Sequence, residues 1–286
     1  GLAGNLADFT FVDRNGNVVS GSDVDYNGSP TGYTQDPQEN VTYVSKHDNQ
    51  TLFDINAYTM PQDSTLAERV RAQNLGLGIV TFGQGMHFFH AGSDLLRSKS
   101  LDRDSYNSSD WFNRLDWTYQ SNNFAVGMPP EGVNSEQWDT IRPILQNESL
   151  IPSSDDIMLN MNVFQEMLAI RYSSPLFRLQ TEQQVQERLA FHNTGAEQTP
   201  GVIVMSLSDT VGEDLDPNHD LVVVVFNATP DSIAYNVDAL VGAGLELHPI
   251  QQNSFDAIVQ GASFASETGT LNVPAWTTAV FVVPQS

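Results

Sequence analysis

The sequence predicts an α/β region followed by an all-β region, and three observations support this fold class. A strand, a helix and a second strand follow one another between residues 41 and 89, in the order and spacing of a βαβ unit. An amphipathic helix is expected at 156–172. From about residue 181 the apolar residues form short runs separated by turn-forming residues, which is typical of an antiparallel β-sandwich. We therefore expect two domains, residues 1–180 and residues 181–286.

Residues 1–40 are rich in Gly, Asn, Asp, Ser and Pro, which favour turns. Short strands are expected at 9–12 and 18–19, on either side of an Asn-Gly pair at 15–16. This composition indicates a long loop of the α/β region more than an independent domain.

The β-branched, apolar run at 41–45 predicts the first strand of the βαβ unit. It ends abruptly in Lys46, His47, Asp48 and Asn49, as a buried parallel strand does when it delivers polar side chains to the rim of a sheet. A second interpretation stays open at this point. Asp and Asn after a strand are most often turn residues, and a His-Asp pair alone is weak evidence for catalysis.

The connecting helix is expected at 65–81, because Thr65 and Glu68 have the spacing of a capping box. The second buried strand, at 86–89, leads into a long irregular stretch at 92–138. Loops of that length are usually functional or disordered, and the many aromatic residues of this one argue against disorder. Strands of the all-β region are then expected at 189–191, 202–207, 221–226, 245–249 and 277–283.

The chain carries 35 acidic and 12 basic residues, and its formal net charge of −23 should repel nucleic acid and anionic membranes. No apolar run reaches the roughly 18 residues of a transmembrane helix. There is no cysteine, and the histidines lack the spacing of metal ligands, so we predict no metal site. Because the first residue is not methionine, we expect a piece of a longer polypeptide or a processed chain. The location stays open among a secreted, a cytoplasmic and, in a plant, a plastid soluble protein.

Two segments resemble conserved regions of one enzyme family. Residues 43–52 read YVSKHDNQTL and are similar to a segment of the α-amylase-like glycoside hydrolases, above all the starch-debranching pullulanases and limit dextrinases. Residues 92–113 read GSDLLRSKSLDRDSYNSSDWFN and resemble the same subfamily over their whole length. Asp94 stands where related enzymes commonly have glutamate. The strand-rich tail also resembles the domain that follows the catalytic barrel of these enzymes.

The resemblance implies that residues 1–180 are the C-terminal portion of a (β/α)8 TIM barrel and that residues 181–286 are an antiparallel β-sandwich behind it. The implied reaction is retaining hydrolysis of α-1,6-glucosidic linkages. The implied partners are α-glucans, such as pullulan, limit dextrin and amylopectin fragments, and the upstream part of the same polypeptide. No cofactor is assigned, and calcium binding by the full-length enzyme is left open.

Glycoside hydrolysis passes through an oxocarbenium-like state, which a nearby carboxylate stabilises. The resemblance makes Asp48 this transition-state stabiliser, bound to hydroxyls of the sugar in subsite −1. It makes His47 a hydrogen-bonding partner of the same sugar. Asn49 either contacts the substrate or orients the loop.

In the second segment, the resemblance suggests that Arg103 and Asp104 reach glucose units on the non-reducing side of the cut bond, and Glu136 matches a further substrate contact. An arginine can donate to two oxygens, and an aspartate can accept from two hydroxyls. The alternative is an internal salt-bridge network among the charged residues of the loop, which are Asp94, Arg97, Lys99, Asp102, Arg103 and Asp104.

The family's nucleophile and acid/base motifs do not occur in residues 1–40, so we expect both carboxylates upstream of this chain. We therefore predict that residues 1–286 alone do not hydrolyse pullulan. Two other functions stay open: an isoamylase-like debranching enzyme, and a non-catalytic α-glucan-binding protein that retains half a site. A comparison of pullulan with glycogen tests the first, and the sequence upstream of Gly1 tests the second.

Overall fold

A computed structural model describes residues 1–285 of the chain, which form two compact units. The first unit comprises Gly1–Thr42, Gly78–Phe88 and the chain from Glu166 onward. The second comprises Tyr43–Leu77 and Phe89–Gln165. The division of the sequence near residue 180 stays a prediction.

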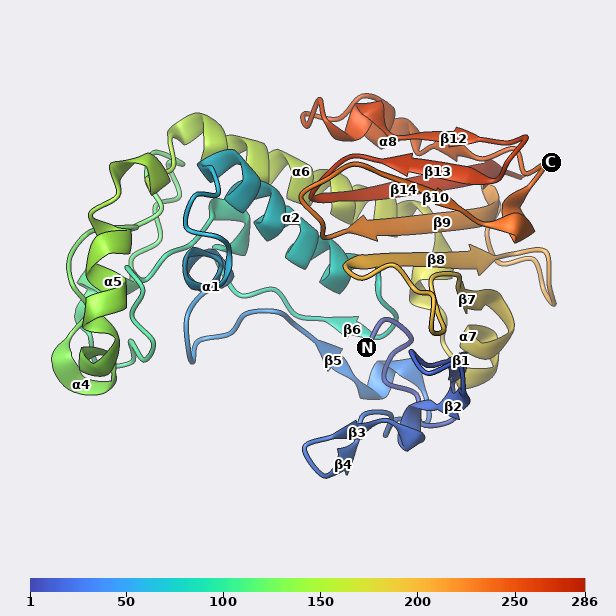
Figure 1. Cartoon of the computed structure of the whole chain (residues 1–286), viewed down its shortest axis with the longest axis horizontal. Helices are drawn as coiled ribbons and strands as arrows, with labels where there is room; N and C mark the ends of the chain where they lie inside the picture. The colour runs from blue at the N-terminus through green and yellow to red at the C-terminus, as the bar shows by residue number, and fades with distance from the viewer. Residues whose placement is uncertain (286) are drawn as a thin grey trace. The chain divides into compact units, whose positions relative to one another are not determined.

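Two antiparallel sheets form the C-terminal part of the first unit (Figure 1). The larger sheet has the order β11-β14-β9-β8-β7, and the smaller sheet has the order β10-β13-β12. Both contribute to one core of buried aliphatic and aromatic side chains, which includes Val223, Leu271 and Phe281. The strands are β7 (Leu189–Phe191), β8 (Val202–Ser208), β9 (His219–Asn227), β10 (Ile233–Asn236), β11 (Glu246–Leu247), β12 (Ser263–Ala265), β13 (Thr270–Val273) and β14 (Thr277–Pro284).

The prediction of short antiparallel strands in this region is confirmed for β7, β8, β9 and β14. The strand expected at 245–249 is wrong in extent. Only β11 is paired, and α8 (Pro249–Gln252) begins at the proline, whose ring fixes φ and whose nitrogen cannot donate to a sheet. Strands β10, β12 and β13 were missed, because each has only three or four residues and contains no long apolar run.

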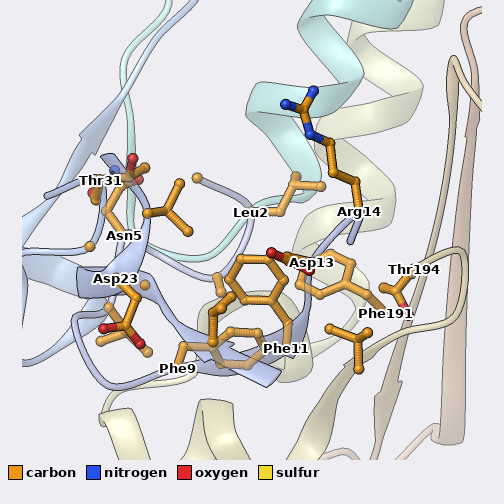
Figure 2. Close-up of a pocket in the computed structure, with 18 of the residues that line it drawn as sticks. Leu2, Asn5, Phe9, Phe11, Asp13, Arg14, Asp23, Thr31, Phe191 and Thr194 are labelled. Carbon is orange, nitrogen blue, oxygen red and sulfur yellow. Dashed lines mark hydrogen bonds between the residues drawn. The ribbon is translucent and has the colours of Figure 1, made fainter. Parts of the chain in front are cut away.

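Two short hairpins shape the N-terminal segment: β1 (Thr10–Val12) pairs with β2 (Val18–Ser20), and β3 (Asp25–Tyr26) pairs with β4 (Ser29–Pro30). The first pair confirms the two expected strands. The segment borders a cavity of about 950 Å³ in the first unit (Figure 2). Phe9 and Phe191 meet edge to face beside this cavity, with ring centroids 5.9 Å apart.

The predicted βαβ unit is present. Strand β5 (Val41–Thr42) pairs in parallel with β6 (Met86–His87), and α2 (Leu66–Phe82) connects them in the sequence. The expectation of two longer, buried strands is wrong, since Val41 is 47% exposed and Met86 is 50% exposed. Within residues 1–285 this sheet has only these two strands, so each strand lacks a neighbour on one side.

The second unit is helical, around a core that includes Phe53, Leu96 and Ile141. The stretch at 92–138 contains only short helices, and buried amides order it. Asn122, for example, donates its side-chain N–H to the carbonyl of Leu96 at 2.7 Å. Besides the first part of α2, the helices of this unit are α1 (Leu52–Thr59), α3 (Ser109–Asn113), α4 (Glu131–Asn134), α5 (Trp138–Leu145) and the first part of α6 (Ser154–Ser173).

The two long helices lie where the sequence predicted them, and capping side chains explain their starts. The Thr65 hydroxyl accepts the backbone N–H of Glu68 at 3.3 Å, and the Glu68 carboxylate accepts that of Thr65 at 2.7 Å. Ser153 and Asp156 form the same reciprocal pair before α6. Among the helices of residues 1–285, none is both long and apolar enough to span a membrane.

Candidate active site

The candidate site lies in the second unit and is built from two loops. The first loop, residues 45–51, follows β5 and leads into α1; the second, residues 90–108, follows β6. His90 connects them, since its Nδ1 lies 3.3 Å from the Ser45 hydroxyl and its Nε2 lies 3.0 Å from Nη1 of Arg97. Burial, together with the positive charge of Arg97, lowers the pKa of His90 to about 4, so its ring is neutral near pH 7.

Asp48 lies at the exposed tip of the first loop. Its carboxylate accepts a hydrogen bond from the Lys46 ammonium group and lies 3.0 Å from Nδ1 of His47. The side chain of Asp48 is 55% exposed and that of His47 is 85% exposed. The hydrogen bond from Lys46, supported by the charge of His47, holds the pKa of Asp48 below its usual value. The site therefore presents an ionised carboxylate beside an accessible imidazole.

Asn49 joins Asp48 to the second loop. Its side-chain oxygen accepts the Nε–H of Arg103 at 3.3 Å. Its backbone lies in the left-handed region, with φ at 59°, a conformation that Asn adopts more readily than most residues. The structure thus brings together His47, Asp48, Asn49 and Arg103, and their roles stay predictions.

A buried asparagine holds the backbone around Arg103. The Asn134 side-chain oxygen accepts the backbone N–H of Arg103 at 3.0 Å, and its amide donates to Asp102 at 2.9 Å. Asp102 also accepts the backbone N–H of Asp104 at 3.0 Å. Glu136 is exposed two residues beyond Asn134, in the short helix Ser135–Gln137. Asp104 follows Arg103 directly and Glu136 lies two residues after Asn134, and the roles of both stay predictions.

The charged residues of the second loop make hydrogen bonds mainly to backbone groups and amides. Lys99 is 1% exposed and donates to the backbone carbonyls of His47 and Asn49. Arg97 donates to the carbonyl of Ala91 at 2.9 Å. Burial raises the pKa of the half-buried Asp94. These contacts keep the loop in place, and Arg103 is exposed.

Asp54 is a second carboxylate near the two loops, but it is completely buried at the start of α1. It accepts the hydroxyl of Ser98 at 2.5 Å and the backbone N–H of Lys99 at 2.8 Å. Burial raises its pKa to about 6. Asp54 holds the second loop against α1 and has no access to a ligand.

Several backbone conformations in the second loop are unfavourable for residues with a side chain. Leu96, Ser100 and Leu101 have φ values of 55°, 52° and 65°. Such conformations usually persist only where the surrounding contacts determine them, and they concentrate at functional sites. Leu96 and Leu101 are completely buried, so packing supplies these contacts.

Comparison with known proteins identifies the family. A family described as "Alpha-1,6-glucosidases, pullulanase-type, C-terminal" matches residues 119–284. The chain belongs to this pullulanase-type family. Glu136 lies inside the matched range, and the two loops with His47, Asp48 and Arg103 precede it.

Similar proteins cover the whole chain, including both loops. The chain is 47% identical to "Pullulanase 1, chloroplastic" of Arabidopsis thaliana, over 99% of this chain and 30% of that protein. It is 43% identical to a pullulanase of Klebsiella pneumoniae, over 100% of this chain and 26% of that protein. It thus spans less than a third of each relative.

Solved structures give the same result for the fold. A crystal structure of pullulanase from Klebsiella pneumoniae in complex with maltotriose matches with a TM-score of 0.95 and 44% identity. The match covers 100% of this chain and 31% of that chain. The mixture of helices and antiparallel sheets is therefore that of the corresponding region of a pullulanase.

Three residues of the candidate site were not singled out from the sequence: Asp54, His90 and Asn134. A signal existed for Asp54, because Thr51 and Asp54 have N-cap spacing, and the Thr51 hydroxyl does accept the backbone N–H of Asp54 at 3.2 Å. His90 and Asn134 act through partners distant in the sequence, so no local pattern marks them. Within residues 1–285, no group of three or more His, Cys, Asp or Glu side chains could hold a metal ion.

Proposed function

We propose that residues 1–286 form the C-terminal part of a debranching hydrolase that cleaves α-1,6-glucosidic linkages in pullulan, limit dextrins and amylopectin fragments with retention. The observation that carries this proposal is the exposed, ionised Asp48 beside His47, which Asn49 links to Arg103. A carboxylate, an imidazole, an amide and a guanidinium group provide the donors and acceptors that sugar hydroxyls need. The maltotriose bound in the similar Klebsiella pneumoniae pullulanase supports an α-glucan ligand.

We propose that β5 and β6 belong to a larger parallel sheet, a (β/α)8 barrel that extends to about residue 180. Parallel strands are normally buried on both faces, within sheets of several strands. Here Val41, Met86 and Phe88 are each about half exposed, and the pair has an open edge on both sides. Further parallel strands would cover these side chains and pair both edges. Residues 181–286 would then be the domain that follows the barrel.

The same proposal assigns roles to the site residues. Asp48 stabilises the positive charge that develops on the sugar ring, and His47 donates a hydrogen bond to a hydroxyl of that sugar. Asn49 positions Arg103, which can donate to two oxygens of a glucose unit. Asp104 accepts from sugar hydroxyls on the non-reducing side, and Glu136 makes a further substrate contact.

A retaining mechanism needs a nucleophile and an acid whose carboxyl groups lie about 5–5.5 Å apart. Neither candidate motif occurs in this chain, so both groups must come from other barrel strands of the complete polypeptide. We therefore expect residues 1–286 alone to bind glucan weakly and to leave pullulan intact. Release of maltotriose from pullulan by the isolated chain would contradict this assignment.

The test of the proposal is the variant Asp48→Asn in the complete polypeptide, with pullulan as the substrate. The substitution removes the charge but keeps the size, so kcat should fall by about 10³-fold or more. Asp63→Asn, at an exposed carboxylate in the same unit, is the matched control and should keep full activity. Turnover by Asp48→Asn that equals the control would remove Asp48 from the mechanism.

Two outcomes separate the alternative functions. A wild-type polypeptide that hydrolyses glycogen faster than pullulan would indicate isoamylase-like specificity. A polypeptide that binds pullulan without cleaving it would indicate a binding protein.

A further inference from the structure

Lys99 is one of only two lysines in the chain, and it is buried within the second loop of the site. Its Nζ donates to the carbonyl of His47 at 3.0 Å and to the carbonyl of Asn49 at 2.8 Å. These carbonyls belong to the peptide bonds before Asp48 and after Asn49. One ammonium group therefore fixes the backbone on both sides of Asp48 and Asn49.

The backbone geometry shows why this contact matters. The left-handed φ of 59° at Asn49 turns the chain sharply just after Asp48. Asn adopts this region more readily than most residues, and the hydrogen bonds to the His47 and Asn49 carbonyls hold the turn in place. While the ammonium group holds both carbonyls, the Asp48 side chain is 55% exposed.

The backbone of Lys99 is itself held in place by Asp54. The backbone N–H of Lys99 donates to the Asp54 carboxylate at 2.8 Å, and the neighbouring Ser98 hydroxyl donates to it at 2.5 Å. Asp54 belongs to α1, which begins directly after the first loop. Lys99, in the second loop, thus contacts both the first loop, through its ammonium group, and α1, through Asp54.

We infer that Lys99 is a positioning residue for Asp48, whose buried ammonium group holds the first loop so that the carboxylate faces the α-glucan; this inference rests on the proposed function. Lys99 itself does not reach the ligand. It acts through the His47 and Asn49 carbonyls, and a displacement of about 1 Å at a catalytic group lowers turnover by about 100-fold.

The kinetic test compares Lys99→Met, Lys99→Arg and wild type in the complete polypeptide. Met keeps the length of the side chain but cannot donate, so kcat on pullulan should fall by about 100-fold. KM should change by no more than about threefold, because Asp48 acts on the charge that develops in the transition state more than on ground-state binding. Arg can restore donation to one or both carbonyls, so the kcat of Lys99→Arg should be at least about tenfold higher than that of Lys99→Met.

Gln73→Met is the matched control. Gln73 is 1% exposed, and its side-chain N–H donates to the carbonyl of Ser93 at 2.9 Å, without touching the first loop. Its removal deletes a buried hydrogen bond to a backbone carbonyl in the same unit. An equal loss of kcat in Gln73→Met and Lys99→Met, or an unchanged kcat in folded Lys99→Met, would overturn the inference.

An experiment on the unmodified chain is independent of activity. Labelling with [¹⁵N]lysine gives two side-chain signals, one from Lys99 and one from the partly exposed Lys46. The Lys99 ammonium protons should exchange slowly with water and show couplings to the carbonyl carbons of His47 and Asn49. Rapid exchange of the ammonium protons of both lysines with water would contradict the hydrogen bonds from Lys99 to the two carbonyls. This result would decide the question even if Lys99→Met did not fold.

The two experiments also separate this inference from the proposed function. If wild type does not hydrolyse any branched glucan but the Lys99 couplings are present, the proposed function fails and the hydrogen bonds from Lys99 to the two carbonyls stand. If Asp48→Asn inactivates the enzyme while folded Lys99→Met retains its kcat, the proposed function stands and the positioning role fails.

Discussion

The buried carboxylate of Asp54 should make the stability of the second unit depend on pH. Burial raises its pKa from 3.8 to about 6 in the folded chain. Because the folded pKa is higher, the folded state binds more protons than the unfolded state between pH 4 and 6. Stability therefore falls as the pH rises through this window, and the loss is complete above about pH 6.

The size of this effect follows from the shift. Each pKa unit corresponds to about 1.4 kcal/mol, so ionised Asp54 lowers the free energy of unfolding by about 3 kcal/mol in total. Roughly half of this loss, about 1.4 kcal/mol, falls between pH 5 and pH 8. The substitution Asp54→Asn removes the titration. Its amide oxygen can still accept the backbone N–H of Lys99, and its N–H can donate to Ser98.

Urea unfolding at pH 5 and pH 8 measures this prediction. Tryptophan fluorescence is a suitable probe, since Trp111, Trp117 and Trp138 belong to the second unit. The stability of Asp54→Asn relative to wild type should increase by about 1.4 kcal/mol from pH 5 to pH 8. The exposed control Asp63→Asn should show no such change. If the free energies of unfolding of Asp54→Asn and wild type differed by the same amount at both pH values, the reasoning about Asp54 would be refuted.

Three further predictions concern other parts of the chain. Thr65→Ala removes the cap of α2 and should lower the free energy of unfolding by about 1 kcal/mol in urea; an unchanged midpoint would contradict the cap. Arg188→Met leaves the buried Asp209 carboxylate without its ion pair and should destabilise the first unit by about 3–5 kcal/mol, with partial recovery in the double variant with Asp209→Asn. His90, with a pKa near 4, should show no NMR titration between pH 5.5 and 8, and a midpoint near 6.5 would contradict its burial beside Arg97.

The sequence predicted elements whose signals are local. The run of four valines in β9, the capping box before α2 and the amphipathic pattern of α6 are all local in the sequence, and the structure contains all three elements. Helix α1 also carries a local signal, the N-cap at Thr51, but its buried polar Asp54 obscures the apolar pattern of the helix.

Features that depend on distant residues could not be predicted. The apolar runs at β5 and β6 read as buried strands, yet their burial depends on neighbouring strands that residues 1–285 do not contain. The position of Lys99 under the first loop depends on residues about fifty positions away, which spacing within either loop cannot show. The grouping of His47, Asp48, Asn49 and Arg103 was expected only through the family resemblance.

The most direct test of the account is a crystal structure of the complete polypeptide with bound maltotriose. The account predicts that the Asp48 carboxylate accepts hydrogen bonds of about 2.5–3.0 Å from hydroxyls of one glucose unit, with His47 beside the same unit. The Lys99 ammonium group should lie behind Asp48, between the carbonyls of His47 and Asn49. If the maltotriose bound elsewhere and the Asp48 carboxylate faced bulk solvent, the central claim would be contradicted.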